Sequence, residues 1–448
     1  MPGIAGIAGV GKREIVTRML DRMAHRGRAG QDVAELDGVT LGSVWPECLP
    51  SPVCRELLLV RDGAGEGRFA EARATNGGIT LSRDPVGAAP LYYGRGPDGE
   101  LCFASEVKGL LEATRDVNEV PPGCTCDGTQ TRRYFEWRPP APLSGPPAEI
   151  ADGLRSRLAE AVHRCIRQDT VGAWLSGGLD SSAMAALARP HVRKLYTVSG
   201  GVADAPDLAF AREVAGFIGS EHDEVVVTLP EMLAVLPAVI YHLESFDALL
   251  VRSSVMNYLV ARRMAERVGE AFSGEGGDEL FAGYEYLKGL DPRDLAGELV
   301  DITGRLHNTA LQRVDRCAAA HGLVVSVPFV NPEVVDYGLQ VPVELKIRNG
   351  VEKWILRRAM EGLLPPPVLN RPKAKFWQGA GVGELLAQHA DEIVSDDDFS
   401  HEHKLDNGWE LGSKEELMYY RLFRECYGRA YSFSWMGRTK PTPGRTGG

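Results

Sequence analysis

The first part of the chain alternates short apolar runs with polar and glycine-rich turns. A helical spacing of apolar residues over 15–24 interrupts this pattern and predicts one helix. The apolar runs themselves predict β-strands over 4–10, 56–60, 78–82 and 101–104. The segment up to about Tyr134 is therefore expected to form an α+β domain built on sheets.

From residue 150 onward, apolar strands alternate with amphipathic helices. The predicted strands cover 171–175, 195–199 and 225–227. The predicted helices cover 150–167, 181–188 and 207–218. Because strands that alternate with helices form parallel sheets, we expect an α/β domain with a doubly wound parallel sheet. The patterns after Tyr284 are mostly helical and predict added helices around that sheet.

A proline-rich segment, 136–150, separates these two patterns. Closely spaced prolines favour an extended and semi-rigid spacer. The alternative is a long surface loop inside a single domain. We expect a division into an N-terminal domain over 1–137, a linker over 138–150, a second domain over 151–436 and a flexible tail over 437–448.

Net charge, the length of the apolar runs and cysteine spacing limit the kinds of partner that the protein is expected to bind. The net charge is −11, from 61 acidic and 50 basic residues in 448, and this opposes a chain that coats nucleic acid. No apolar run reaches the roughly 18 residues that span a membrane. The eight cysteines form no Cys-x-x-Cys pair, which disfavours a structural zinc site and suits a reducing compartment. We expect a cytoplasmic protein without a nucleic-acid or membrane partner.

The sharpest motif joins a predicted strand to a predicted helix and reads Ser176-Gly177-Gly178-Leu179-Asp180-Ser181-Ser182. The glycines let the backbone turn tightly and approach an anion, and the helix N-terminus favours negative charge there. Asp180 would repel a bare phosphate, so its presence indicates a bridging Mg²⁺. The alternative is an ordinary strand–turn–helix in which Asp180 caps the helix.

A second glycine-rich acidic turn reads Ser-Gly-Glu-Gly-Gly-Asp over 273–278. Asp278 is a natural second carboxylate for the same ion, because two carboxylates and pyrophosphate oxygens suit Mg²⁺. The spacing does not fit an EF-hand loop, and a plain turn remains the alternative.

The first string resembles the pyrophosphate loop of the ATP pyrophosphatase superfamily, whose members cleave ATP between the α and β phosphates. With the second turn, it resembles the synthetase half of the asparagine synthetase (class B) family, which includes β-lactam synthetases and lasso-peptide cyclases. Further similar strings lie at 83–87, 90–93, 103–108, 241–247, 251–254, 315–316, 327–329, 353–357 and 371–373. The resemblance implies an N-terminal sheet sandwich of the Ntn-hydrolase kind and a C-terminal ATP pyrophosphatase domain.

The resemblance also implies a reaction. A carboxylate would attack the α-phosphorus of Mg-ATP, and ammonia or an amine would then displace AMP from the acyl-adenylate. At matching positions Lys373 would stabilise transition-state charge, and Glu275 would orient the amine or accept its proton. Asp180 and Asp278 would hold Mg²⁺, and Arg252 would pair with the substrate carboxylate. ATP and pyrophosphate would be bound by Leu175, Ser176, Gly177, Gly178, Asp180, Ser181, Ser182, Ser273 and Gly274.

The N-terminal part departs from the family. A working glutaminase of this family needs a cysteine directly after the initiator methionine, and this chain has Pro2 there. His25-Arg26-Gly27 matches the family's H-R-G, but Arg28-Ala29-Gly30 replaces the residues that follow it. We expect a degenerate amidotransferase domain that does not hydrolyse glutamine and serves as a structural partner. A homodimer or an ammonia-supplying partner is the expected assembly.

The acceptor pocket departs as well. Asparagine synthetases carry two threonines where this chain has Leu249 and Leu250, and a glutamate of the family is Val324 here. The pocket is therefore expected to be more apolar and to take a carboxylate other than free aspartate. The alternatives are an asparagine synthetase fed with ammonia, an intramolecular lactam-forming cyclase, a non-catalytic scaffold, and a sulfur-inserting or tRNA-modifying member of the superfamily.

Overall fold

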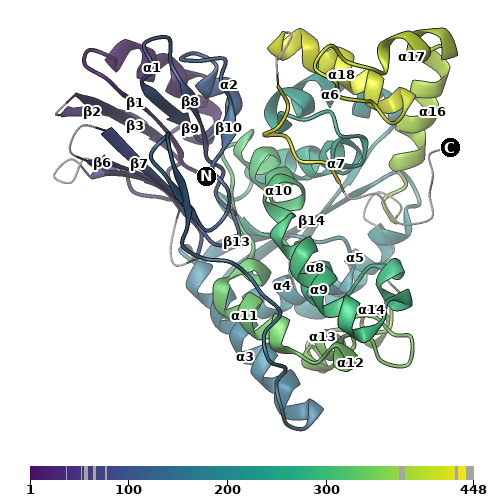
Figure 1. Ribbon diagram of the computed structural model, residues 1–448. Helices are drawn as coiled ribbons and strands as arrows, with labels where there is room; N and C mark the ends of the chain where they lie inside the picture. Colours follow the sequence, from purple (N-terminus) through teal and green to yellow (C-terminus); the bar gives the residue numbers. More distant parts are fainter. Residues whose placement is uncertain are drawn as a thin grey trace.

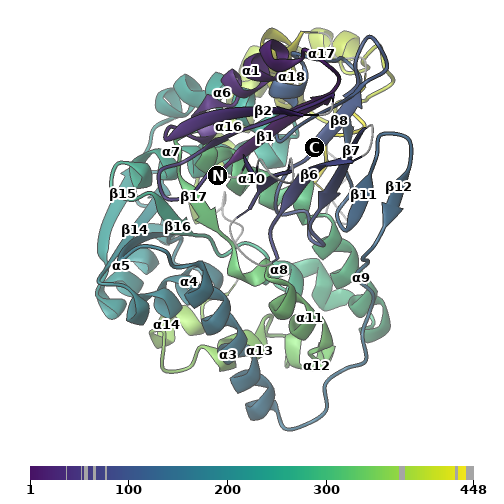
Figure 2. The same cartoon turned by 90° about the vertical axis from the view of Figure 1, so that its left-hand side faces the viewer.

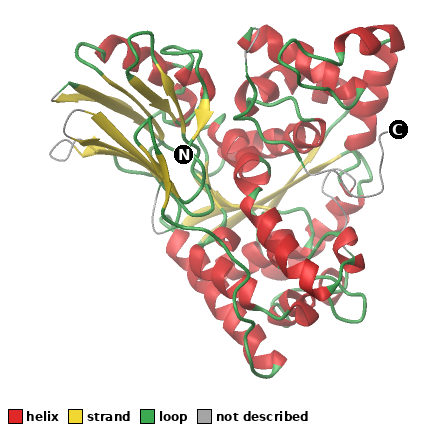
Figure 3. Cartoon of the chain, in the orientation of Figure 1, coloured by secondary structure: helices red, strands yellow, loops and turns green. Residues whose placement is uncertain are grey.

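The structure, a computed structural model, describes residues 1–36, 38–51, 53–54, 59–63, 67–75, 78–372, 379–428 and 432–439. Its N-terminal domain consists of two six-stranded sheets (Figure 1, Figure 3). The first has the order β10 (Asn118–Glu119), β8 (Tyr92–Arg95), β9 (Leu101–Ala104), β1 (Gly3–Ala8), β3 (Val39–Trp45), β2 (Gly30–Leu36). The second has the order β12 (Thr131–Arg133), β11 (Cys124–Cys126), β7 (Gly78–Arg83), β6 (Ala70–Thr75), β5 (Leu59–Asp62), β4 (Val53–Cys54).

Apolar side chains fill the space between these two antiparallel sheets. The helix α1 (Arg13–Asp21) packs against β1 and β3 through Val16, Met19 and Leu20. This helix confirms the one predicted over 15–24, and the sandwich confirms the predicted sheet-based α+β domain. The buried residues shared by the two sheets include Ile4, Leu41, Leu81, Leu91 and Phe103.

The C-terminal domain is built on a five-stranded parallel sheet. Its order is β15 (Glu221–Val226), β14 (Lys194–Gly201), β13 (Thr170–Trp174), β16 (Glu270–Phe272), β17 (Val324–Ser326). The predicted parallel sheet is therefore confirmed. One face of it packs on α3 (Pro147–Cys165), α4 (Leu179–Ala188) and α5 (Pro206–Ile218). The other face packs on α7 (Ala248–Ala265) and α10 (Ala310–Ala319), and α6 (Leu229–Leu243) packs on these two helices.

Further helices surround this sheet, as predicted (Figure 1). They are α8 (Gly277–Leu280), α9 (Pro292–Gly304), α11 (Pro332–Gln340), α12 (Val343–Lys346), α13 (Trp354–Ala359), α14 (Pro366–Leu369), α16 (Gly383–Ile393), α17 (Asp396–Glu402) and α18 (Lys414–Tyr427). Two of them bear on the pocket described below, because α8 carries Asp278 and α13 begins next to Lys353.

The boundaries differ from those predicted in three places. The helix α3 begins at Pro147, inside the predicted linker, because a proline is well tolerated in the first turn of a helix. The predicted tail is held at its start, since Thr439 donates from its backbone N–H and its hydroxyl to Asp247 at 3.1 and 2.8 Å. The strand predicted over 225–227 begins earlier, at Glu221, because an edge strand tolerates charged residues.

The chain between β12 and α3 is extended and follows the outside of the molecule (Figure 2). It is not detached, because Trp137 donates from its indole nitrogen to the carbonyl of Pro85 at 3.2 Å, and the backbone N–H of Leu143 donates to Gln340 at 2.8 Å. The segment thus connects the two domains while contacting both.

Among the described residues, no individual helix has the length and apolar content to cross a membrane. The pair α6 and α7 meets that test only when the two are taken together, and they are bent by 110° with respect to each other. Both helices carry many side chains that are buried in the apolar core of this domain.

Candidate active site

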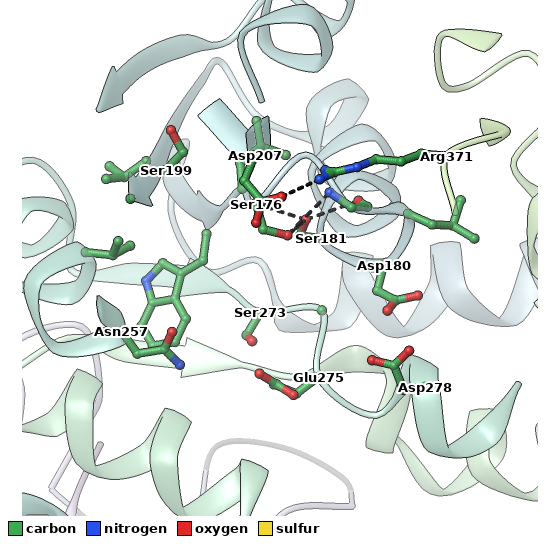
Figure 4. A pocket seen from close by; sticks show the side chains of 18 of the residues that line it. Ser176, Asp180, Ser181, Ser199, Asp207, Asn257, Ser273, Glu275, Asp278 and Arg371 are labelled. Carbon is green, nitrogen blue, oxygen red and sulfur yellow. Dashed lines mark hydrogen bonds and ion pairs between the residues drawn. The ribbon is translucent and has the colours of Figure 1, made fainter. Parts of the chain in front are cut away.

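A pocket lies at the carboxyl end of the parallel sheet, where β13, β14 and β16 end (Figure 4). Ligand sites are expected at this edge of an open α/β sheet. The empty volume of the pocket is about 960 Å³. Most of the residues predicted for the site line it together, namely Leu175, Ser176, Gly178, Asp180, Ser181, Ser273, Gly274, Glu275 and Asp278.

Two serines close the loop between β13 and α4. The hydroxyl oxygens of Ser176 and Ser181 lie 3.0 Å apart, and the backbone N–H of Ser176 donates to Ser181 Oγ at 3.1 Å. Gly177 has a φ of +68°, and a Cβ at this position would lie 2.6 Å from the backbone nitrogen of Ala211. The loop is thus compact, and the amino end of α4 is open to an anion in the pocket.

Three charged side chains from different elements meet beside this loop. Lys353, which is 1% exposed, contacts the carboxylate of Asp180 and lies 2.5 Å from Oδ1 of Asp278. Asp180 stands in the first turn of α4 and Asp278 in α8. Asp180 and Asp278 therefore face one point, as Figure 4 shows.

These two carboxylates could supply oxygen ligands to a Mg²⁺ ion. Mg²⁺ prefers oxygen ligands and is usually bound by one or two carboxylates together with phosphate oxygens and waters. Among the described residues, no cluster of three or more His, Cys, Asp or Glu side chains could hold a metal. Asp180 and Asp278 would accordingly supply part of a coordination shell that a bound nucleotide completes.

The two motif loops lie against each other. A Cβ on Gly274 would be only 2.5 Å from the backbone nitrogen of Ser181, so glycine is required for this approach. The next residue, Glu275, is ion-paired with Arg313 of α10. Burial alone would lower the pKa of Arg313, but the adjacent Glu275 carboxylate outweighs burial and raises it. Glu275 is therefore held at the wall of the pocket by a cation from a distant helix.

A buried carboxyl group with a raised pKa supports the second loop. Glu279 is buried, follows Asp278 directly, and accepts a hydrogen bond from the Tyr284 hydroxyl at 2.5 Å. Burial, and then the neighbouring charge of Asp278, raise the pKa of Glu279 to about 7. This side chain thus adds less negative charge beside Asp278 than an ordinary glutamate would.

Sequence reasoning missed several residues of the pocket. Arg371 forms an ion pair with Asp207, and its guanidinium lies 4.1 Å from the centre of the Phe210 ring. Arg357 donates to the carbonyls of Leu369 and Arg371 at 2.5 and 3.0 Å. The sequence signal for Lys353, Arg357 and Arg371 is that they lie in the strings 353–357 and 371–373, which resemble the family. The pocket residues missed include Trp174, Asn257, Asp207, Lys353, Arg357 and Arg371.

Some predicted residues lie elsewhere. Ser182 is fully buried and does not line the pocket, because it faces the protein core from the first turn of α4. Arg252 is not at the pocket, since its guanidinium binds both carboxylate oxygens of Glu415, with Nε at 2.7 Å from each. The predicted role of Arg252 with a substrate carboxylate is therefore not supported. Lys373 lies outside the described residues.

The sequence was compared with known proteins. The profile of the asparagine synthase family matches residues 153–301 and 291–439, and that of the glutamine amidotransferase domain matches residues 64–124. An asparagine synthetase [glutamine-hydrolyzing] 2 of Arabidopsis thaliana is 33% identical over 342 residues, 70% of this chain and 59% of that protein. A probable asparagine synthetase [glutamine-hydrolyzing] of Schizosaccharomyces pombe is 32% identical over 392 residues, 78% of this chain and 70% of that protein.

One solved structure, that of an NMN synthetase from Francisella tularensis, aligns with 65% of this chain and 98% of that chain at 14% identity and a TM-score of 0.30. This chain spans about three fifths of the Arabidopsis relative, 59% of its length. The asparagine synthase profile covers most of the chain, and both motif loops of the pocket lie inside the matched residues. The chain therefore belongs to the asparagine synthase family.

Proposed function

We propose that this protein is an ATP-dependent, AMP-forming amide synthetase. The observation that carries the proposal is the meeting of Asp180, Asp278 and Lys353 beside a serine- and glycine-rich loop at a helix N-terminus. That arrangement offers a helix end and a lysine to phosphate groups, and two carboxylates to Mg²⁺. A bound Mg²⁺ would neutralise pyrophosphate charge as the bond between the α and β phosphates breaks.

In the first step, a carboxylate oxygen of the substrate attacks the α-phosphorus of ATP, and pyrophosphate leaves with the bonding electron pair. Ser176 and Ser181 lie at the loop, where their hydroxyls can donate to pyrophosphate oxygens. Lys353 is buried. A buried cationic group beside the reacting phosphates stabilises the negative charge that develops in the transition state. By resemblance we assign the same kind of role to Lys373.

In the second step, the nitrogen of ammonia or an amine attacks the acyl carbon, and AMP leaves. The nitrogen loses a proton in this step, and a carboxylate at the pocket wall can accept it. Glu275 lines the pocket and its side chain is 27% exposed, so a substrate can reach it. Arg313 forms an ion pair with this carboxylate and holds it at the pocket wall.

We further propose that the protein has no glutaminase of its own and takes nitrogen from solution or from a partner. A nucleophilic cysteine needs a lowered thiol pKa. Burial instead raises the thiol pKa of Cys48, Cys102, Cys124, Cys165, Cys317 and Cys426. The position where the family carries its nucleophile holds Pro2.

Asparagine synthesis from aspartate and ammonia is the second candidate, favoured by the names of the relatives. Against it stands Arg252, which is bound by Glu415 and does not reach the pocket. The side chains of Trp174, Val198 and Val260 add apolar surface to the pocket. We therefore propose a substrate carboxylate that is larger and more apolar than aspartate.

The test is a screen of carboxylic acids with Mg-ATP and ammonium present and glutamine absent. The expected products are AMP and pyrophosphate in equal amounts, formed with an acid other than aspartate. AMP formation with aspartate alone would favour asparagine synthesis. Formation of ADP would contradict the proposed chemistry, and no nucleotide turnover with any acid would favour a non-catalytic scaffold.

A further inference from the structure

The helix α10 contacts both the pocket and the N-terminal domain within one turn. Arg313 is ion-paired with Glu275 at the pocket wall. Two residues later, Asp315 faces the N-terminal domain and accepts two hydrogen bonds from Arg26, at 2.8 and 3.0 Å. Neighbouring residues of an α-helix are only about 1.5 Å apart along its axis. A shift of α10 at Asp315 therefore displaces Arg313 by a comparable distance.

The contact between Arg26 and Asp315 is buried and well supported. Arg26 is 0% exposed and Asp315 is 3% exposed. Arg26 also donates to Glu106 at 2.6 Å and to the carbonyl of Pro2 at 2.8 Å, so its position is fixed by the residues just before β1 and just after β9. Arg68 donates to Asp315 from the N-terminal domain as well, at 2.9 Å.

A second set of contacts fixes the next residue of α10. Arg316 donates to Glu244 at 3.0 Å and to the carbonyl of Ser105 at 3.2 Å. Glu244 in turn accepts from the backbone N–H groups of Val107 and Lys108, at 3.0 and 2.8 Å. The N-terminal domain thus holds α10 at two consecutive residues, and both attachments are buried.

Charge accounts for the rigidity of this connection. Burial alone would raise the pKa of Asp315, but the guanidinium groups of Arg26, Arg316 and Arg68 hold it well below its usual range. Asp315 is therefore ionised in the folded protein. An ionised group without its partners is costly in a buried place, so α10 cannot leave Arg26 without a large loss of stability.

We propose that the N-terminal domain positions Glu275 for amide formation through α10, and that Arg26 is a positioning residue of the synthetase pocket. This inference rests on the proposed function in assigning Glu275 to the second step. It gives the amidotransferase-like domain a role that needs no glutaminase chemistry. The positional relation itself rests on the contacts of α10 with Glu275 and with the N-terminal domain, and not on the assigned reaction step.

The test compares Arg26→Gln and Arg68→Gln in the full chain with Arg18→Gln. Arg18 is a matched control, because its ion pair with Glu14 lies on the surface of the same domain. The first readout is labelling of the Glu275 carboxyl group by a water-soluble carbodiimide and glycine ethyl ester, measured by mass spectrometry. The second readout is hydrogen exchange of residues 310–319.

Arg26→Gln is expected to increase both labelling of Glu275 and exchange of α10 by about tenfold, with a smaller increase for Arg68→Gln and none for Arg18→Gln. Labelling of Glu416, a buried carboxyl group of α18, should not change, which separates release of α10 from general loosening. Unchanged Glu275 labelling in folded Arg68→Gln and Arg26→Gln proteins overturns the inference.

Because Arg26 is fully buried, its variant can fail to fold. Asp315→Asn removes the same ion pair by changing its acidic partner. Arg68→Gln changes a side chain that is 21% exposed, so at least one variant that weakens the attachment of α10 can be tested in a folded protein. Binding of Mg-ATP by the wild-type protein is measured separately. If the wild-type protein does not bind Mg-ATP, the proposed function is contradicted. The labelling of Glu275 tests the positional role independently of that result.

Discussion

The ammonium group of Lys353 lies 2.5 Å from Oδ1 of Asp278 and also contacts Asp180, so one buried cation joins the two motif loops of the pocket. The two aspartates come from α4 and α8, and the lysine directly precedes α13. In the structure, this lysine occupies the point that both carboxylates face. The charge of this lysine therefore compensates two carboxylates that would otherwise repel each other.

Replacing Lys353 with Met should destabilise the protein in the absence of magnesium. The change leaves two carboxylates, with side chains 11% and 15% exposed, close together without this cation. Removing one partner of a buried ion pair costs about 3–5 kcal/mol. Urea unfolding with and without Mg²⁺ measures the effect, and Mg²⁺ should stabilise the variant more than the wild type. Lys194→Met, which removes a surface pair with Glu221, serves as the control and should change little.

Replacing Gly177 with Ala should weaken both the fold and nucleotide binding. A non-glycine residue at a φ of +68° costs about 1–2 kcal/mol, and the new Cβ would lie 2.6 Å from the backbone of Ala211. The overlap pushes α5 away from the loop. Gly216→Ala is the control. Gly216 lies in α5, the helix that Gly177→Ala would displace, and a Cβ on Gly216 meets nothing within 4 Å. That control should stabilise by roughly 0.5–1 kcal/mol, and equal behaviour of the two variants would contradict the prediction.

Acid should destabilise the protein through His242. Burial, and then the charge of Lys108, lower the pKa of His242 from 6.5 to about 2, and its ring lies 4.5 Å from that of His25. The unfolded chain takes up a proton below pH 6.5 and the folded chain does not, so stability is present above that pH and is lost as the pH falls. The loss from this residue is up to about 1.4 kcal/mol per pH unit.

The comparison of His242→Gln with the wild type isolates this effect. Urea unfolding between pH 6.5 and 5 should show a shallower dependence on pH for the variant. Glu279 has the opposite effect on stability, because its pKa is raised to about 7 and its contribution grows as the pH falls. Both proteins contain Glu279, so its effect cancels when their pH dependences are compared. His401→Gln, an exposed position on α17, is the control. Identical slopes for wild type and His242→Gln would refute the assignment.

Glutamine should not replace ammonium as the nitrogen donor. The thiols with raised pKa values are protonated at neutral pH and are poor nucleophiles. Glutamate release from glutamine, measured before and after alkylation with iodoacetamide, is expected to stay at background. Cys165 lines the cavity next to Met1 and Pro2, so Cys165→Ser is the informative variant and should behave as wild type. Glutamate release that alkylation abolishes would demonstrate a working glutaminase.

Local patterns predicted much of the fold. The strand, glycine turn and helix around Ser176 were predictable because all three are set by residues that follow one another in the chain. The sheet-based N-terminal domain was predicted, yet several of its strands were not. The strand β2 (Gly30–Leu36), for example, carries Gln31, Asp32 and Glu35, and its pairing with β3 decides its structure. Propensity within a single segment cannot show such pairing.

The order of the residues was enough to predict a glycine-rich loop that carries Asp180 and a second acidic turn that carries Asp278. The charged partners of these two loops come from distant parts of the chain and follow from the fold. Lys353 is 173 residues from Asp180, and Arg313 is 38 residues from Glu275. Arg252, in contrast, is paired with Glu415 and does not line the pocket. An ion pair depends on where two side chains meet in space, and residue order alone does not select among the many possible partners of opposite charge.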